Sequence, residues 1–237
     1  MEAAVKTPVA QSGEVGKDLV WVRECPWLPR QYIDTARSVA EKWAFKSDFV
    51  APVGSIHFSE EEKTFAREFR AKRGSFYVIE PNVKGSFSGS NKAWPFANWQ
   101  EFMDLEGVYG NQHPFLQLGP SQHSRQLSGV PFVHTKEGFR QALCILEASD
   151  GFLGTDGGLH HAAAALGKPA VVLWGHYTSP KNLGYSSHVN IWHEPEGSPC
   201  GTLGACEECD RAMANISVGE LQHGFEVMRE RRIAAAS

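Results

Sequence analysis

The distribution of hydrophobic and polar positions changes at about residue 75. After this point, short uninterrupted apolar runs alternate with segments whose apolar residues recur at helical spacing. Uninterrupted apolar runs are typical of strands buried on both faces of a parallel sheet. Strands are expected at residues 76–79, 115–118, 130–133, 152–153, 170–174 and 189–192, and helices near residues 96–105, 138–148 and 159–166 and after Ser217. This alternation predicts an α/β fold, a Rossmann-like parallel sheet with helices on both faces.

The front of the chain has a different pattern. Residues 1–17 are small and polar, so we expect a disordered leader there. Apolar residues at 19–22 and 49–53 predict two strands, with an amphipathic helical pattern between them. Ser59 and Glu62 form a capping-box pattern, which opens a helix that ends near residues 73–74. We therefore expect a reduced N-terminal α/β subdomain over residues 18–74 and a second domain over residues 75–237.

Composition and charge exclude several classes of protein. The 237 residues carry a formal net charge of −4, which argues against nonspecific nucleic-acid binding because such proteins usually carry a basic excess. No apolar run approaches the roughly 18 residues that a membrane span needs, and the N-terminus lacks the apolar core of a signal peptide. Five cysteines without regular spacing fit a reducing compartment. We therefore expect a soluble, cytoplasmic protein with no membrane span.

Residues 152–180 contain the most informative pattern in the chain. An apolar run is followed by Asp156, Gly157 and Gly158, and an alanine-rich helix begins at Leu159. The first backbone N–H groups of a helix have no partner within the helix and its dipole is positive at that end, so a phosphate is favoured there. Asp156 has two interpretations, because it either contacts the ligand or only caps the helix. We favour a phosphate site at the glycine turn in which Asp156 takes part.

The order of residues in this region resembles the nucleotide-sugar-binding motif of glycosyltransferase family nine, the heptosyltransferase family. The usual form of that motif is D-[ST]-G-x-x-H-x-x-A-A-L-G-x-P, and the chain follows it from Asp156 through His161 to Pro169, with Gly157 in place of Ser or Thr. Other segments that resemble the family are Tyr77-Val78-Ile79-Glu80-Pro81, Lys92-Ala93-Trp94-Pro95 with Trp99, Leu116-Gln117-Leu118-Gly119, and Cys200, Cys206 and Cys209 ahead of Ile216. The resemblance covers about residues 75 to 231 and implies that residues 75–237 are the nucleotide-sugar-binding half of a GT-B enzyme.

The resemblance implies roles for individual residues. Asp156 would contact the sugar or fix the glycine turn, His161 would hold the diphosphate end, and Lys92 would reach a phosphate. His161 also has an interpretation as a packed histidine, and Lys92 lies in a polar loop where most lysines are solvated. His160 points about 100° away from His161 on a helix, so we expect it at the surface or facing the substrate. Gly157 lacks the hydroxyl donor that the family has at this position.

The nucleoside pocket is expected at Gly119 and residues 120–122, with residues 136–137 as its other wall. Loop 85–91 is rich in glycine and serine, and we expect it to be a mobile flap over the donor. The family's proposed general base, an Asp near the start of the first domain, has no matching position, so no catalytic residue is assigned. The expected nucleotide-sugar site comprises Lys92, Gly119, Asp156, Gly157, Gly158 and His161.

By this resemblance the chain is a glycosyltransferase that uses a nucleotide-diphosphate sugar with an ADP-heptose-like donor. Fixed donors must stabilise the charge of the leaving diphosphate, and the glycine turn with Lys92 offers them without a metal or other cofactor. We expect a metal-independent, inverting transfer, with a glycan or glycolipid precursor as the candidate acceptor. Family members have two domains of similar size, whereas only residues 18–74 precede the second domain here. Two alternatives therefore stay open: a non-catalytic nucleotide or nucleotide-sugar binding module, and one subunit that a partner or a second copy completes.

The cysteines near the C-terminus allow two interpretations. Cys200, Cys206 and Cys209, with His193 upstream, supply enough ligands for a zinc ion, and a Cys-x2-Cys pair is a common half-site. A single pair of this kind with irregular spacing is weak support, however. We therefore favour unmetallated thiols or a disulfide, and we expect no metal site.

Overall fold

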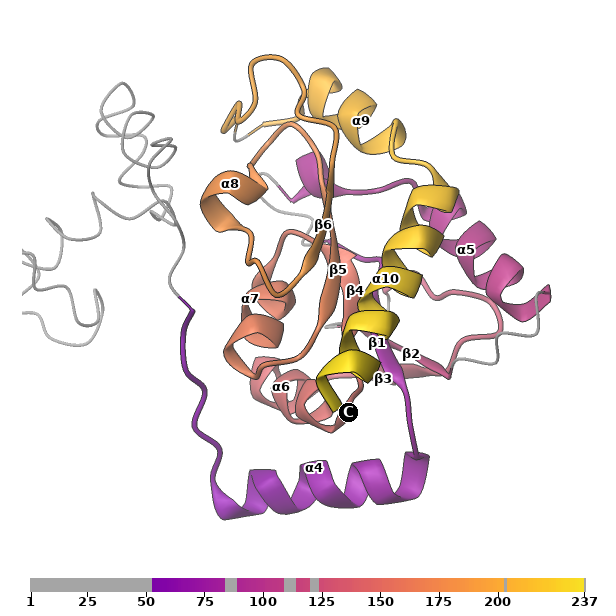
Figure 1. The fold of residues 1–237 in the computed structure, drawn as a ribbon, viewed down its shortest axis with the longest axis vertical. Coiled ribbons are helices and arrows are strands. Elements are labelled where there is room, and N and C mark those ends of the chain that lie inside the picture. The colour runs from indigo at the N-terminus through magenta and orange to yellow at the C-terminus, as the bar shows by residue number, and fades with distance from the viewer. Residues whose placement is uncertain (1–52, 84–88, 109–113, 120–123, 203, 237) are drawn as a thin grey trace, which may run out of the picture. The chain divides into compact units, whose positions relative to one another are not determined.

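The computed structural model describes residues 53–83, 89–108, 114–119, 124–202 and 204–236 (Figure 1). Pro52–Pro180 with Gly184–Ser237 form one compact unit, which holds nearly all of the described residues. This unit contains a six-stranded sheet. The expected leader and the strands near residues 19 and 49 lie outside the described residues.

All neighbouring strands of the sheet are parallel, in the order β3-β2-β1-β4-β5-β6. In the centre, Val78 of β1 pairs with Leu116 of β2 on one side and with Phe152 of β4 on the other. The strands are β1 (Tyr77–Glu80), β2 (Phe115–Gly119), β3 (Phe132–His134), β4 (Phe152–Thr155), β5 (Ala170–Trp174) and β6 (Val189–Trp192). The α/β, Rossmann-like fold expected from the sequence is confirmed.

The apolar runs became strands because helices cover both faces of the sheet. Every residue of β2, β4 and β5 is buried, and such strands need side chains that are apolar in both directions. The expected strand at 130–133 begins two residues later, at Phe132. Pro131 has no N–H to donate to the ladder, although its carbonyl accepts a hydrogen bond from Gln117 N.

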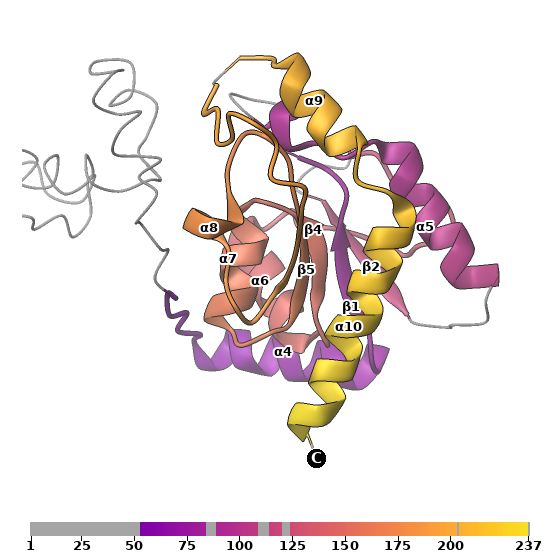
Figure 2. The ribbon, with the colours of Figure 1, turned by 45° about the horizontal axis from the view of Figure 1, so that its top comes forward.

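Two layers of helices enclose the sheet (Figures 1 and 2). On one face α5 (Phe96–Val108) and α10 (Val218–Ala236) contact each other, and they share a core with Ile79, Leu153 and Val171. On the other face α7 (Gly158–Ala165) packs on β4 and β5, and α6 (Phe139–Ala148) packs on α7.

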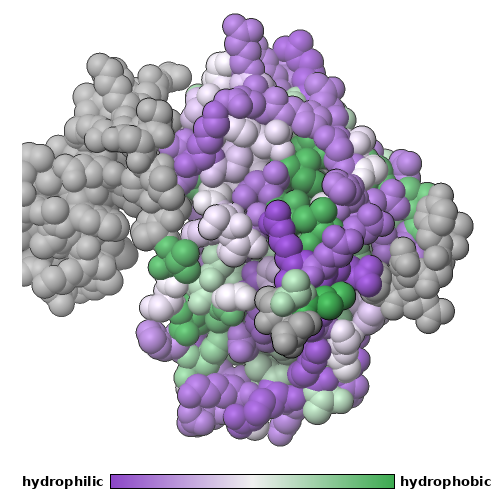
Figure 3. Space-filling model, in the orientation of Figure 1, coloured by the Kyte–Doolittle hydropathy of each residue, from purple (hydrophilic) through white to green (hydrophobic). Residues whose placement is uncertain are grey.

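Helix α4 (Glu60–Arg73) packs on α6 within the same compact unit as the sheet. Its expected capping box is present, because Ser59 Oγ accepts from Glu62 N at 3.2 Å and Glu62 Oε2 accepts from Ser59 N at 2.8 Å. The outer side of this helix is charged, and the surface at the bottom of Figure 3 is accordingly mostly hydrophilic. The expected helix end at residues 73–74 is also confirmed.

Three short elements were not expected from the sequence. They are the 3₁₀ turn η2 (Ser90–Lys92) and the helices α8 (Pro180–Leu183) and α9 (Glu207–Ala214). Helix α10 follows α9 and begins as expected, since Ser217 Oγ accepts from Glu220 N at 3.3 Å and Glu220 Oε2 accepts from Ser217 N at 2.8 Å. Among the described helices, none combines the length and the apolar character that crossing a bilayer requires.

Candidate functional site

The order of the strands defines where a ligand site is expected. The chain runs from β1 outward through β2 to β3, and then returns to β4 and continues in the opposite direction to β6. The direction reverses between β1 and β4, which are hydrogen-bonded neighbours. In open α/β sheets, ligands bind outside the carboxyl ends of the strands at such a reversal. Here the segments that follow β1, β4 and β5 meet at that point.

An ion pair joins the first two of these segments. Lys92 Nζ lies 2.7 Å from Oδ2 of Asp156, and the same oxygen accepts a hydrogen bond of 2.6 Å from Oγ1 of Thr178. The Asp156 side chain is 4% exposed, whereas that of Lys92 is 22% exposed and lies over the ring of Tyr177 at 5.0 Å. Burial alone would raise the pKa of Asp156, but the charges of Lys92 and His160 and the hydrogen bonds from Lys92 and Thr178 together outweigh it, so the pKa is lowered. The carboxylate is therefore ionised, and the ammonium group keeps a solvent-accessible side.

The position of Lys92 depends on the tryptophan that follows it. Trp94 is buried, its Nε1 donates to the carbonyl oxygen of Ile216 at 2.9 Å, and its ring meets Trp99 edge-to-face at 4.8 Å. A fixed Trp94 holds the short η2 turn, and Lys92 is the last residue of that turn. The K-x-W-P segment thus has a physical explanation in this fold. The buried Trp94 anchors the segment in the core, and Lys92 extends from it to Asp156.

The glycine turn forms the start of α7. Gly157 is the N-cap with an extended backbone (φ −178°), and Gly158 is exposed to solvent. Gly157 N donates to Nδ1 of His160 at 3.0 Å, so this N–H is already used and the remaining donors are those of the first helical residues. A Cβ at Gly158 would lie 3.2 Å from the ring of Phe139. The first two residues of the turn thus carry no side chains of their own, which leaves the helix N–H groups open to an anion from the side away from Phe139.

The expectation for His160 was wrong. Its side chain is fully buried, and its ring lies 5.3 Å from that of Trp174 and 6.3 Å from that of His188. The reason is the hydrogen bond to Gly157, which turns the ring back toward the first turn of the helix. His160 therefore shapes the glycine turn from inside the protein.

His161 lies on the more open side of the same helix. It is half-buried, and its Nδ1 lies 2.8 Å from the hydroxyl oxygen of Tyr185. Burial first, and the neighbouring His160 second, lower the pKa of His161 to about 4. His161 is thus neutral near pH 7, and any contact with a diphosphate would be a hydrogen bond and not an ion pair.

The expected nucleoside pocket is only partly described. Gly119 ends β2 and is buried, and a Cβ there would lie 2.6 Å from the Phe132 ring and 2.7 Å from Ser124 Oγ. The structure therefore gives Gly119 a packing reason, and its proposed contact with a nucleoside stays a prediction. Residues 120–122 and most of the expected flap at 85–91 lie outside the described residues. Lys136 and Glu137 are exposed.

Sequence reasoning missed three residues at this end of the sheet. Tyr177 and Thr178 follow β5 closely in the sequence, and polar residues just after the carboxyl end of a buried strand are a signal that could have identified them. Glu80 is the last residue of β1, and burial raises the pKa of its carboxyl to about 7. A carboxyl group with a shifted pKa at a strand end is typical of functional sites.

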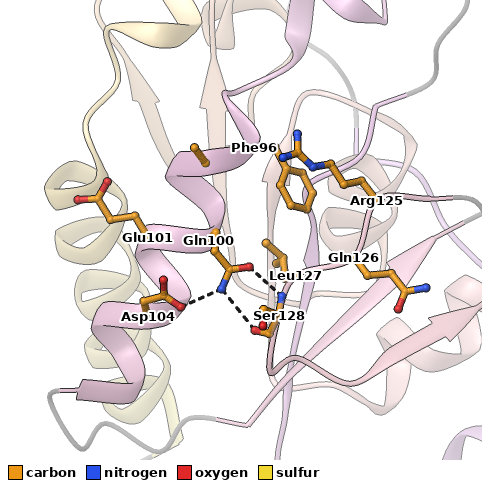
Figure 4. Close-up of a pocket in the computed structure, with 9 residues that line it drawn as sticks. Phe96, Gln100, Glu101, Asp104, Arg125, Gln126, Leu127 and Ser128 are labelled. Carbon is orange, nitrogen blue, oxygen red and sulfur yellow. Dashed lines mark hydrogen bonds between the residues drawn. The ribbon is translucent and has the colours of Figure 1, made fainter.

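A separate groove of about 680 Å³ lies away from these residues. Figure 4 shows it between α5 and the segment 125–128, where Arg125 stacks on Phe96 at 4.0 Å and Gln100 bonds Ser128. None of the expected nucleotide-sugar residues lines this groove. The strand-end site is therefore the better candidate, because it combines the charge pair, the helix start and the reversal of strand order.

The fold defines a Rossmann-like α/β domain with a candidate site at the carboxyl ends of its strands. The chain belongs to glycosyltransferase family 9 (heptosyltransferase), whose family model matches residues 29–205. No curated protein matches the chain.

Several solved structures share the fold. A family 9 glycosyltransferase from Veillonella parvula is 18% identical with a TM-score of 0.58, and the match covers 73% of this chain and 53% of that one. The iron-containing dodecameric glycosyltransferase TibC from enterotoxigenic E. coli is 14% identical with a TM-score of 0.54, covering 66% and 45%. The ADP-heptose LPS heptosyltransferase II of E. coli is 13% identical with a TM-score of 0.56, covering 94% and 70%. The chain thus spans about half the length of the first two proteins.

Proposed function

We propose that this chain binds the diphosphate of a nucleotide sugar at the strand-end site and takes part in transferring the sugar to an acceptor. The observation that carries the proposal is the Lys92–Asp156 ion pair beside the open start of α7, at the reversal between β1 and β4. An ADP-heptose-like donor is the first candidate. The family is that of the heptosyltransferases, and a structure of TibC with a TM-score of 0.55 is a complex with ADP-D-beta-D-heptose.

The charges of the site suit the leaving group of this reaction. The bond between the anomeric carbon and the diphosphate oxygen breaks, an acceptor oxygen bonds to that carbon, and negative charge accumulates on the nucleotide diphosphate. Lys92 and the first N–H groups of α7 are fixed donors where this charge would form, and donors fixed before reaction cost no reorganisation. The acceptor hydroxyl loses its proton to a base that we do not assign. We propose a single, inverting displacement.

In this proposal the transfer step needs no metal ion. The ammonium of Lys92 takes the place that a divalent cation has in other transferases, and Asp156, which accepts a hydrogen bond from Thr178, holds it there. Asp156 is then a positioning residue, because its buried carboxylate faces Lys92 and Thr178. The acceptor surface would come from residues beyond the described part of the chain, from a second copy, or from a partner subunit.

A thermal-shift screen with ADP, GDP, UDP and ADP-heptose tests the proposal. A nucleotide that binds only the folded state adds about 2.7 kcal/mol to the free energy of unfolding at a concentration of a hundred times Kd, and the melting temperature rises accordingly. We expect one nucleotide class to give a shift that Lys92→Ala abolishes and Lys168→Ala keeps. Lys168 is the matched control, since it follows α7 and lies 3.7 Å from Glu147. No response to any nucleotide would refute the proposal.

Turnover separates an enzyme from a binding module. Release of free nucleotide diphosphate from the responding sugar nucleotide, by the chain alone or with added acceptor, is expected for a transferase. Binding without any release would favour the non-catalytic module instead.

A further inference from the structure

Four metal-ligating side chains converge beyond the carboxyl end of β5. They are His176, Cys200, Cys206 and Cys209, and one ligand atom from each lies within 4.8 Å of all the others. Cys200 Sγ and Cys209 Sγ are 3.4 Å apart. A tetrahedral zinc ion with bonds of about 2.3 Å to sulfur separates its sulfur ligands by about 3.8 Å. The cluster therefore has the size of a zinc site, and it differs from the nucleotide-sugar site proposed above.

The ring of His176 is oriented as a metal ligand. It is 3% exposed, and its Nε2 lies 2.9 Å from the carbonyl oxygen of Glu196. Because a carbonyl oxygen only accepts, Nε2 is the donor in this contact, and Nδ1 is the ring nitrogen left to bind a metal. Nδ1 is buried and has no hydrogen-bond partner within the described part of the chain. A histidine ligand typically donates its other ring N–H to a carbonyl in this way.

Hydrogen bonds of the backbone hold the loop that carries the cysteines. Cys200 N donates to the carbonyl oxygen of His176 at 2.9 Å, which ties the first cysteine directly to the histidine. Asn91 is buried and donates to the carbonyl oxygens of Thr202 at 2.8 Å and Gly204 at 2.7 Å. These contacts hold the loop at Cys200, Thr202 and Gly204, all of which precede Cys206.

The last two cysteines belong to the start of a helix. Cys206 is the N-cap of α9 and Cys209 is buried within its first turn. The positive end of a helix dipole favours thiolates.

We propose that His176, Cys200, Cys206 and Cys209 bind one zinc ion in a closed tetrahedral site that fixes the loop before α9 to the end of β5. Three thiolates and one imidazole are a ligand set of structural zinc, and four protein ligands leave no open position for catalysis. His193, the fourth ligand considered from the sequence, is outside the cluster, because its Nε2 pairs with Glu220 Oε1 at 2.5 Å and its side chain is 41% exposed. The proposal reverses the expectation of unmetallated thiols.

Metal analysis of the full chain, purified without added metal or chelator, tests the site. We expect one equivalent of zinc, and a melting temperature that falls when a chelator removes it, because binding stabilises the folded state. Cobalt(II) in its place is expected to give the intense visible absorption of a tetrahedral ion with thiolate ligands. Trace zinc only, one equivalent of iron in its place, or a Cys200–Cys209 disulfide detected by mass would each overturn the proposal.

Matched variants identify the ligands. Cys206→Ser and His176→Gln are expected to lose the metal, whereas Cys144→Ser and His193→Gln are expected to keep it. Cys144 is a buried cysteine on α6 outside the cluster, so its variant controls for the loss of a thiol from the core. Cys206 is only half-buried, and far-ultraviolet circular dichroism of its variant shows whether the fold persists. Retention of zinc by both ligand variants would also overturn the proposal.

Discussion

The ammonium nitrogen of Lys92 lies 2.7 Å from a carboxylate oxygen of Asp156, although the two residues are on different segments that follow β1 and β4. These two strands are the neighbours between which the sheet reverses its order. The ion pair therefore spans the position where α/β sheets bind ligands. Because Asp156 is almost completely buried and Lys92 is not, the pair presents its positive member to the solvent.

The first prediction concerns removal of the positive charge. Lys92→Met leaves the Asp156 carboxylate buried without its ion pair, which we expect to destabilise the fold by about 3 kcal/mol. The nucleotide-induced rise in melting temperature should disappear as well. Urea unfolding gives the first quantity, and thermal shift with the responding nucleotide gives the second.

A double variant separates the two effects. In Lys92→Met combined with Asp156→Leu, both charges are absent, so we expect most of the stability to return while nucleotide binding stays lost. Recovery of nucleotide binding in this double variant would show that Lys92 acts only through the fold. A nucleotide shift in the single variant Lys92→Met equal to that of the unmodified chain would place the ligand elsewhere.

The second prediction concerns Gly157, where the family usually has Ser or Thr. The extended backbone suits any residue, and a Cβ at this position would have the Thr155 carbonyl oxygen as its nearest neighbour, at 3.8 Å. Gly157→Ser is therefore expected to change the free energy of unfolding by no more than about 0.5 kcal/mol, since serine is a slightly better N-cap than glycine and the difference is only a few tenths of a kcal/mol. The added hydroxyl should leave the nucleotide-induced shift in melting temperature equal or larger.

Gly151→Ala is the contrasting substitution. Its Cβ would lie 2.8 Å from the backbone carbonyl oxygen of Pro169, and backbone cannot move as a side chain can. We expect a loss of about 1–3 kcal/mol. Equal stability of the Gly157 and Gly151 variants in urea would contradict this interpretation of the two glycines.

The strands of the sheet could be predicted well because a strand that is buried on both faces has an uninterrupted run of apolar residues. Residues 170–174 are apolar throughout, and the strand observed there, Ala170–Trp174, is buried at every position. Capping boxes at Ser59 and Ser217 are equally local, and both helices begin where they were expected. Short elements without apolar periodicity, such as η2 and α9, left no comparable signal.

The contacts of the site were harder to predict because they join distant segments. Lys92 and Asp156 were each selected from motifs, but neither spacing nor composition shows that they form an ion pair. A helical wheel placed His160 outward, and the hydrogen bond to Gly157 reversed this. His176 lies far from Cys209 in sequence, so only the fold could select it over His193.

The third prediction concerns the amino ends of the strands, opposite the candidate site, where Asp150 joins several elements. Its carboxylate accepts from Arg70 of α4 at 2.9 Å, from Arg232 of α10 at 2.5 Å, and from Phe76 N at 2.9 Å, and it also bonds Ser75. Asp150→Asn removes the charge and is expected to cost about 2–4 kcal/mol. Urea unfolding measures the loss, and Asp104→Asn, at an exposed residue of α5, is the control that should stay within about 0.5 kcal/mol.

The last prediction concerns pH and Glu80. Burial raises the pKa of this carboxyl from 4.5 to about 7 in the folded chain, so the folded state binds a proton there that the unfolded state has released. The associated stability is complete below about pH 4.5 and is lost as the pH rises to about 7, by at most about 3 kcal/mol. Glu80→Gln cannot ionise, and its stability relative to the unmodified chain should therefore increase between pH 5 and pH 8.

The comparison between variant and unmodified chain is necessary because two histidines act in the opposite direction. Burial lowers the pKa of His161 and of His188 to about 4, so their contribution is complete above about pH 6.5 and is lost as the pH falls toward 4. These terms are present in both proteins and cancel in the difference. Urea unfolding at pH 5, 6, 7 and 8 gives that difference, with Glu101→Gln at an exposed position of α5 as the control. A difference that does not change with pH would show that Glu80 is ionised in the folded chain at pH 5.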